Sequence, residues 1–555
     1  MRRLITIGCE SFSMTDEEDI CLEDLSKPIA EKPNENLEQR LQLLVEAERD
    51  EWSELDPSMH LQLTGALINY SEDLARIDGL ERAIELNEEL SVEDLSNFHR
   101  AQRYYQLASA YSTREAFDPD SETEYTFFDS DDLVKSMAYL RAAVASDYLD
   151  DLPVERMVKT YTDFANLLSR LGRVVEALRW YNNALQMNPE HAIALGNRGQ
   201  CKMEYGSLLF TEGHNPMFMY SAYSDLEKAL ENSEDLYSRA EQNFRFLKQK
   251  VERFSDDRLA VENNDEYDLG ESDRNSEYHQ WVLENGLYLN PLNDISKHSS
   301  VAHDYFHLPN MLVPDDDDFP YPGIYNQVKQ EFASARYLYF EAVESEDDGG
   351  HFSDRGVKLP DTLDYAVYGY RTEQVKTALR LSYSIFDKVA EIINHYFEVG
   401  QKNPNFNQVW FQGGDYKQGL AEPFQDSDNW PLNALFWVKK DFHHSISERD
   451  GDSVVTVAHE LRSLRRMAEH DYMKVFHDDI VSSPPNKRVI EDSLYDEVGK
   501  NELQDAALEM LKLSRATLIY VSLAIHHEER LKREELNGKA LPVAGEAMIP
   551  DHLKE

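Results

Sequence analysis

Cysteine and long apolar runs are scarce in this sequence of 555 residues. Its three cysteines, Cys9, Cys21 and Cys201, form no CxxC pair and no pairing framework, so we expect reduced thiols rather than a disulfide scaffold. The apolar run in the N-terminal MRRLITIGCESFSM is too short for a signal peptide. The longest run, ATLIYVSLAI at 516–525, is half the length that a bilayer requires and is expected to be a core helix. We therefore expect a cytoplasmic protein without a membrane partner.

Positive charge is scarce as well. Lys and Arg number 56 against 105 Asp and Glu, so the formal net charge is −49. Acidic residues also gather in short runs such as PDDDD at 314–318. A solvated acidic surface explains this composition and argues against broad, non-specific binding of nucleic acid. Any contact with RNA would therefore need a local patch of basic residues.

Several common site motifs are missing. The sequence contains no GxxxxGK[ST], GxGxxG or HExxH, which removes the commonest nucleotide-binding and zinc-protease sites. The pairs His443-His444 and His526-His527 have no partner ligands at a metal-binding spacing. Apolar periodicity is helical and no strand–helix alternation occurs. We therefore expect an all-α protein of two to four domains, without a metal or cofactor.

The N-terminal half carries an internal repeat. The stretch 158–191, VKTYTDFANLLSRLGRVVEALRWYNNALQMNPEH, has Gly172, Ala177 and Pro189 at the positions of the 34-residue tetratricopeptide (TPR) pattern. A second unit begins at Ala192, and looser ones precede 158. Such repeats stack into an array with a concave groove, so we expect a protein or peptide ligand there. In the alternative interpretation the array only covers the C-terminal half.

Composition divides the chain into five parts, since a polar, acidic stretch separates two helical regions. We expect an acidic N-terminal segment at 1–37, TPR-like repeats at 38–251, an acidic linker at 252–278, a helical bundle at 279–533 and a C-terminal tail at 534–555. In the bundle, helical spacing predicts helices over 324–342, 373–399, 431–442, 454–476 and 501–527.

The predicted helix 454–476 contains an arginine, four residues and a histidine, Arg465 and His470. At about 100° per residue, Arg465 falls beside the apolar stripe of this helix and His470 falls on the opposite side. The two would meet only if the helix is distorted or if a second copy brings them together. Arg466 and His470, at i and i+4, share a face.

The blocks NPLND, NQVKQEFASARY, HFSDR, TLDY and SIFDKVA, followed by this Arg-x4-His, resemble the HEPN superfamily and its leptospiral-type subfamily in particular. The resemblance covers roughly 280–530, and members of the subfamily join TPR-like repeats to a HEPN bundle. It implies an antiparallel helical bundle and a metal-independent endoribonuclease that acts on RNA as a homodimer, in a toxin or antiviral setting. Arg465 and His470 are then the catalytic residues. Family motifs often have a small polar residue after the arginine, whereas this chain has Arg466.

Metal-free RNA cleavage needs proton transfer and a clamp for phosphate charge. Histidine titrates near neutrality and suits the first task, and arginine offers a fixed fork of donors for the second. Supporting residues are expected to be Arg462, Arg466 and Lys474, with Lys376, Arg380, Lys439 and Lys440 as further basic side chains. In the alternative interpretation Arg465 forms a structural salt bridge with a carboxylate such as Asp387. The protein would then be a non-catalytic interaction or nucleotide-binding protein.

Overall fold

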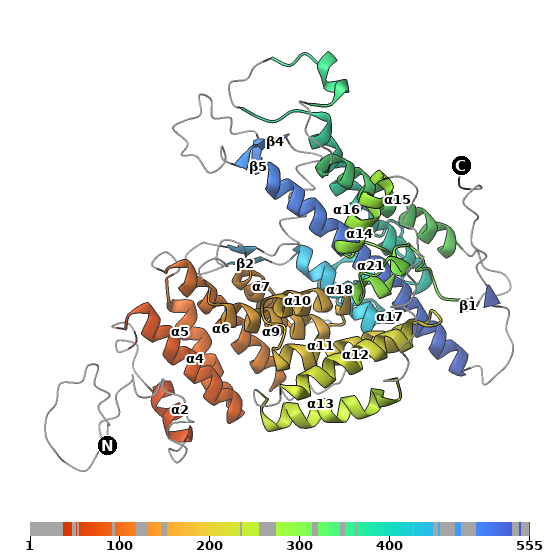
Figure 1. Ribbon diagram of the computed structural model, residues 1–555. Coiled ribbons are helices and arrows are strands. Elements are labelled where there is room, and N and C mark those ends of the chain that lie inside the picture. Colours follow the sequence, from red (N-terminus) through yellow and green to blue (C-terminus); the bar gives the residue numbers. More distant parts are fainter. Residues whose placement is uncertain are drawn as a thin grey trace, which may run out of the picture. The chain divides into compact units, whose positions relative to one another are not determined.

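The computed structural model describes most of the chain, and helices dominate it, which confirms the predicted all-α fold (Figure 1). None of the described helices combines the length and the apolar composition that crossing a bilayer requires. The described residues are 37–46, 52, 55–91, 95–117, 130–145, 152–232, 236–254, 273–312, 320–344, 350–360, 365–425, 427–443, 445–447, 453–455, 472–478, 495–535, 543–544 and 554.

The chain divides into two compact units. One comprises Met1–Leu167 with His444–Val457, and the other comprises Leu168–His443 with Ala458–Glu555. The boundary falls within helix α9 (Val154–Arg170). The linker predicted at 252–278 lies largely outside the described residues, so the domain limits read from composition stay a prediction.

The first unit is built from helices packed in sequence order. Tyr104 and Tyr111 on one helix stack on Tyr139 of the next, with ring centroids 6.0 and 6.1 Å apart. The short strands β2 and β3 pair in antiparallel orientation. The elements are α2 (Leu37–Glu46), α4 (Pro57–Asp73), α5 (Ile77–Glu89), α6 (Asn97–Ala116), α7 (Asp131–Ala143), most of α9, β2 (Ser445–Ser447) and β3 (Ser453–Val455).

The second unit begins with the end of α9 and four further helices. The turn after α9 needs Gly172, whose φ is +82° and whose β-carbon, if present, would lie 2.5 Å from the carbonyl oxygen of Trp430. Gly199 lies where its helix, Ala192–Leu208, crosses the following helix, His214–Glu231. A β-carbon at Gly199 would lie 2.9 Å from Leu226, so the small residue allows the two helices to pack closely. These helices are α10 (Val174–Met187), α11 (Ala192–Leu208), α12 (His214–Glu231) and α13 (Ser238–Val251). The helix pair expected over 158–191 is present, and its assignment to the TPR family stays a prediction.

A second set of helices forms the bundle of this unit. The long ones pack on one another, α15 on α16, α16 on α21 and α18 on α21. They are α14 (Asp273–Glu284), α15 (Tyr321–Val343), α16 (Tyr370–Tyr396), α17 (Glu422–Gln425), α18 (Trp430–His443) and α21 (Lys500–Glu535). Helices α16 and α21 run in the same direction, because their first turns line one cavity and Tyr396 at the end of α16 donates its hydroxyl to Glu529 of α21 at 2.6 Å. Helix α15 runs the opposite way, since its last residues line that same cavity.

Helix α21 is the centre of the bundle. Every residue from Leu513 to Ile525 is buried, which confirms that ATLIYVSLAI is a core helix. Two short strand pairs border it: β1 (Met311–Leu312) pairs with β6 (Val543–Ala544), and β4 (Tyr472–Phe476) pairs in parallel with β5 (Tyr495–Gly499).

Buried polar contacts join the turn before α10 to the bundle. The guanidinium of Arg173 is fully buried and pairs with Glu176 and with Asp441 of α18. The backbone N–H of Val175 donates to the hydroxyl of Tyr520 of α21 at 3.2 Å. Trp430 Nε1 donates to the Arg170 carbonyl at 3.2 Å. Helices α10 and α18 therefore belong to one packed core.

Candidate functional site

The catalytic residues predicted from the sequence lie outside the described part of the chain. This part resumes at residue 472 after a gap that begins at 456. Arg462, Arg465, Arg466 and His470 all fall within this gap. Their catalytic and RNA-binding roles stay predictions, as does the salt bridge between Arg465 and Asp387.

The prediction of a helix over 454–476 is wrong at both ends of this range. Residues 453–455 form β3, and 472–476 form β4. The segment YMKVF is rich in aromatic and β-branched residues, which favour strands. Met473, Lys474, Val475 and Phe476 are all buried, so the strand shows no alternation that would reveal it in the sequence.

Four of the residues predicted to support or pair with the motif, Lys439, Lys440, Lys474 and Asp387, lie in the described part of the chain. Lys474 is only 5% exposed. Lys439 and Lys440 are also buried, each with its ammonium group over the ring of Phe436. Asp387 of α16 accepts the backbone N–H of Phe406 at 3.2 Å.

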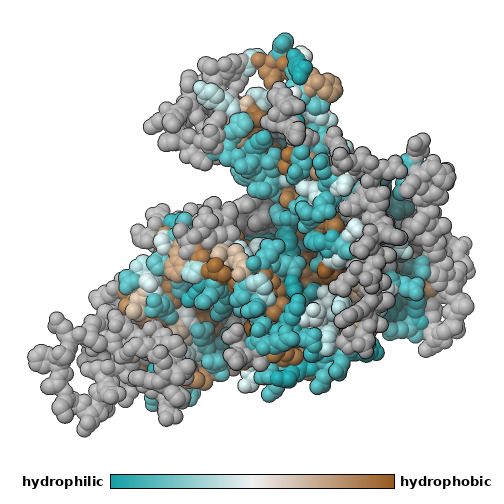
Figure 2. All heavy atoms as spheres, viewed as in Figure 1, coloured by the Kyte–Doolittle hydropathy of each residue, from teal (hydrophilic) through white to brown (hydrophobic). Residues whose placement is uncertain are grey.

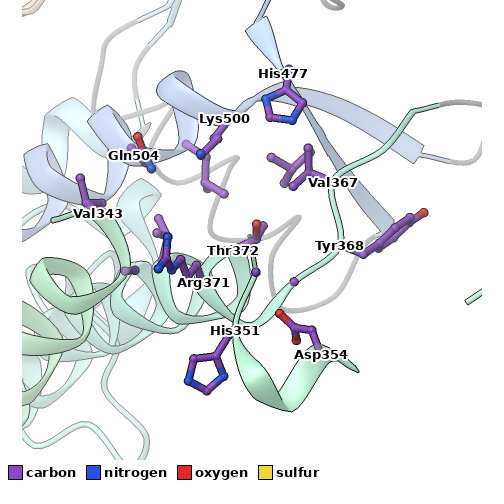
Figure 3. A pocket seen from close by; sticks show the side chains of 16 residues that line it. Val343, His351, Asp354, Val367, Tyr368, Arg371, Thr372, His477, Lys500 and Gln504 are labelled. Atoms are coloured by element: carbon purple, nitrogen blue, oxygen red, sulfur yellow. The ribbon is translucent and has the colours of Figure 1, made fainter. Parts of the chain in front are cut away.

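A cavity of about 310 Å³ opens beside β4 (Figure 3). Segments far apart in the sequence line it: the end of α15, residues 350–354, the first turns of α16 and α21, and β4 with the residue after it. The backbone N–H of Val367 donates to the carbonyl of Val475 in β4 at 2.7 Å, which holds the segment before α16 against the strand. The polar side chains of the lining are His351, Asp354, Tyr368, Arg371, Thr372, His477, Lys500 and Gln504.

Basic groups face this cavity from three elements. Arg371 comes from the first turn of α16, Lys500 from the first residue of α21, and His477 directly follows β4 (Figure 3). Among the described residues, neither Lys500 nor His477 has an ion-pair partner. Positive side chains at the first turns of two helices favour an anionic ligand.

One carboxylate of the lining, Asp354, limits the positive charge of the cavity, and a second, Asp478, directly follows the lining residue His477 in the chain. Asp354 accepts the backbone N–H of Tyr370 at the start of α16, at 3.1 Å from each carboxylate oxygen. Asp478 accepts the N–H of Asn501 in α21 at 3.1 Å. These two N–H groups are therefore already bonded, so they are not available to an anion at this site. Among the described residues no group of three or more His, Cys, Asp or Glu is arranged to hold a metal ion.

Two sequence blocks that suggested the family hold the scaffold together. In NPLND, Asp294 accepts Arg515 Nη1 of α21 at 2.7 Å, and Arg515 also donates to the carbonyls of Tyr288 and Asn290. Burial raises the pKa of Asp294, and Arg515 opposes this rise. In NQVKQEFASARY, the buried Arg336 pairs with both carboxylate oxygens of Asp304, at 2.9 and 2.8 Å.

The cavity was not predicted from the sequence, although the block HFSDR supplies His351 and Asp354 to it. Arg371, His477 and Lys500 belong to no motif. The only sequence signal that favoured them is a positive charge within an acidic chain.

Comparison with known proteins places the family resemblance on part of the chain. No curated protein and no solved structure matches the sequence. Residues 313–528 match the family model of the LA2681-like HEPN domain. This range holds α15, α16, α18, β4 and most of α21, and it includes the cavity. The helical region at 313–528 is therefore of the HEPN type.

Proposed function

We propose that this protein is a metal-independent HEPN endoribonuclease in which Arg465 and His470 carry the chemistry. One observation supports this most directly. Both residues lie within the range that matches the HEPN family, and β4 begins two residues after His470 and reaches the cavity at Val475. The motif is thus connected by a short stretch of chain to a cavity with basic side chains.

The proposed reaction uses the two side chains for different tasks. His470 accepts the proton of the attacking 2′-hydroxyl or donates one to the leaving 5′-oxygen. Arg465 binds the non-bridging phosphate oxygens as negative charge builds up on them. The expected product carries a 2′,3′-cyclic phosphate. Arg462, Arg466 and Lys474 are proposed to support the binding of the backbone.

Charge restricts where RNA can approach. The chain carries a net charge of −49, so a polyanion is repelled from most of its surface. Arg371, His477 and Lys500 offer a local exception at the cavity. We therefore propose that the RNA backbone passes along this cavity toward the motif.

Dimerisation and regulation complete the proposal. Two HEPN bundles are proposed to associate so that the motifs of both copies face one groove, and the TPR-like helices are proposed to bind a protein or peptide that controls cleavage in a toxin or antiviral setting. The buried contacts of Arg173 and Val175 with α18 and α21 support coupling, because they fix the start of α10 to the bundle.

The cavity also favours a second candidate function. Its volume of about 310 Å³ lies at the lower end of the range for small-molecule sites, and its basic lining suits a nucleotide phosphate. In this alternative the bundle binds a nucleotide without cleaving RNA, and the repeats recruit a partner.

Cleavage is tested with the full chain and three variants, Arg465→Ala, His470→Ala and the control His395→Ala. His395 is an exposed histidine of α16 that lines no part of the cavity. We expect cyclic-phosphate ends in total RNA with the wild type and the control, and none with the two motif variants. A folded wild type that yields no such ends, with and without added cell lysate, contradicts the nuclease and favours the nucleotide-binding alternative.

A further inference from the structure

Basic residues gather on α13, the last of the helices that precede the bundle. Residues 238–254, which comprise α13 and the 3-10 turn after it, contain five Lys and Arg against two Glu, although the whole chain carries a net charge of −49. The helix packs mainly on α12 and buries Ala240, Phe244 and Val251. In Figure 1 it lies at the lower edge of the second unit, and Figure 2 shows mainly hydrophilic residues along this edge. A local excess of positive charge therefore lies at the surface of this acidic protein.

The charged residues of α13 are sorted by helix face. At about 100° per residue, Arg239, Lys250 and Arg253 fall within about 40° of Phe246. Glu241 and Glu252 fall about 120–140° away from it. The ring of Phe246 is 55% exposed, and Nζ of Lys250 lies 4.4 Å from its centroid. We define the outward face of α13 by six exposed residues of this side: Arg239, Gln242, Phe246, Gln249, Lys250 and Arg253.

The cations of the outward face are not neutralised by neighbouring carboxylates. Among the described residues, none of its three basic side chains has an ion-pair partner. The two other basic residues of the helix do have partners, since Arg245 pairs with Glu241 at 2.6 Å and Lys248 pairs with Glu227 at 3.0 Å. The positive charge that remains available to a ligand therefore lies on the outward face.

We propose that the outward face of α13 binds an acidic segment of a partner protein, whose carboxylates pair with the three cations while an apolar side chain packs on Phe246. Complementary charge favours such a partner, and aromatic residues and arginine are enriched in protein interfaces. Gln242 and Gln249 add side chains that both donate and accept hydrogen bonds, as a peptide group requires.

Nucleic acid is a poorer match for this face. Phosphate oxygens only accept hydrogen bonds, and one exposed ring offers a stacking surface to one base. The sequence also has acidic residues on both sides of the helix, Glu234 and Asp235 before it and Asp256 and Asp257 after it. A long polyanion would be repelled by these charges, whereas a short acidic segment avoids them. The inference goes beyond the proposed cleavage and does not depend on it, because no residue of the cavity or of the motif takes part.

Binding is measured by fluorescence anisotropy with the full chain and a fluorescein-labelled peptide in which glutamates surround one tryptophan. The peptide has about 14 residues, the length of α13. An analogue with glutamine in place of each glutamate is the neutral control. The net charge of −49 alone would repel the acidic peptide. Tighter binding of the acidic peptide than of its neutral analogue, with an affinity that falls as salt rises, is therefore the expected result of a local cationic face.

Two pairs of substitutions test whether the position of the charge matters. Arg239→Gln with Lys250→Gln is expected to weaken binding of the acidic peptide about 10-fold, because each lost ion pair at an exposed site costs up to about 5-fold. The matched control is Arg245→Gln with Lys248→Gln, which removes the same charge from another side of the same helix and should bind like the wild type. Equal losses in the two variants would show that only net charge matters and would overturn the proposal.

The ring is tested separately. Phe246→Ala should weaken binding at least about 5-fold, whereas Tyr416→Ala, which removes a 70% exposed ring that also has a lysine ammonium group near it, should bind like the wild type. The proposal fails if the acidic peptide binds no better than its neutral analogue, or if Phe246→Ala leaves its affinity unchanged. It also fails if a labelled oligouridylate of about 12 nucleotides binds this face more tightly than the peptide does, because the face then belongs to nucleic acid. Sedimentation in which Phe246→Ala turns a dimer into a monomer would overturn it as well, because a second copy then covers the face.

Discussion

The buried cluster of Arg173, Glu176 and Asp441 offers the sharpest test of how the turn before α10 is held to the bundle. Arg173 donates Nε to Glu176 at 2.8 Å and pairs through Nη1 with Asp441. Its guanidinium is fully buried, and the two carboxylates are 8% and 3% exposed. Burial alone would lower the pKa of Arg173, but the two carboxylates raise it above its ordinary value, so the arginine stays charged.

Removing the cation should be worse than removing one anion. Arg173→Met removes the guanidinium from the buried carboxylates of Glu176 and Asp441. Breaking a buried pair in this way costs about 3–5 kcal/mol, so we expect the free energy of unfolding to fall by an amount near the upper end of this range. Asp441→Asn keeps the contact between Arg173 and Glu176, so we expect the free energy of unfolding to fall by about 3 kcal/mol. Replacing all three by Met, Leu and Leu should recover most of the lost free energy of unfolding, because all three charges of the cluster are then removed together.

Urea unfolding followed by tryptophan fluorescence measures these changes. Five of the six tryptophans, all except Trp52, lie in the second unit, so the signal reports mainly on the unit that contains the cluster. Arg245→Met is the control, because its side chain is 59% exposed in its pair with Glu241 and should change the free energy of unfolding by less than about 0.5 kcal/mol. The reasoning is refuted if Arg173→Met unfolds within about 1 kcal/mol of the wild type, or if the triple variant is as unstable as Arg173→Met.

Two further stability predictions concern Gly172 and His214. Gly172→Ala places a β-carbon at positive φ and against the Trp430 carbonyl, and should cost about 3 kcal/mol. Gly213→Ala, at φ +83° in open space, should cost only about 1–2 kcal/mol, and equal losses in the two variants would contradict the packing argument. Burial, with smaller effects of neighbouring histidines, lowers the pKa of His214 from 6.5 to about 4. The unfolded chain therefore binds this proton first, and the free energy of unfolding should fall by up to about 3 kcal/mol between pH 6.5 and 4. In His214→Leu the free energy of unfolding should fall less between pH 6.5 and 4 than in the wild type. An equal fall in both proteins would show that His214 is not responsible.

Sequence periodicity predicted the long helices well because each carries a wide apolar stripe. Helix α21 is the best case, since the run at 516–525 is apolar on all sides and its residues are buried on all sides. The same logic failed at 472–476. Polar and apolar residues do not alternate there, and parallel pairing with the distant 495–499 decides the conformation. The aromatic and β-branched residues of YMKVF favour a strand only weakly, and a pairing partner so far along the chain cannot be found from local periodicity.

The candidate site was harder to predict than the fold. Its lining comes from five separate segments, and single residues such as Arg371 and Lys500 have no spacing relation that a motif could express. The block NPLND lies before the range 313–528 that matches the family model, and its residues Asp294 and Asn290 act as structural partners of Arg515. Sequence similarity to a family therefore reported mainly on residues that hold helices together.

Helix α21 has a mechanical consequence for the protein. It contains 36 residues and neither proline nor glycine, so it is expected to behave as a stiff rod about 54 Å long. Lys500 at one end lines the cavity, and Tyr520, twenty residues further on, accepts the backbone N–H of Val175. A movement of the turn before α10 would therefore displace α21 as one rigid body, because this helix has no hinge along its length. Lys500 would then change its position in the cavity.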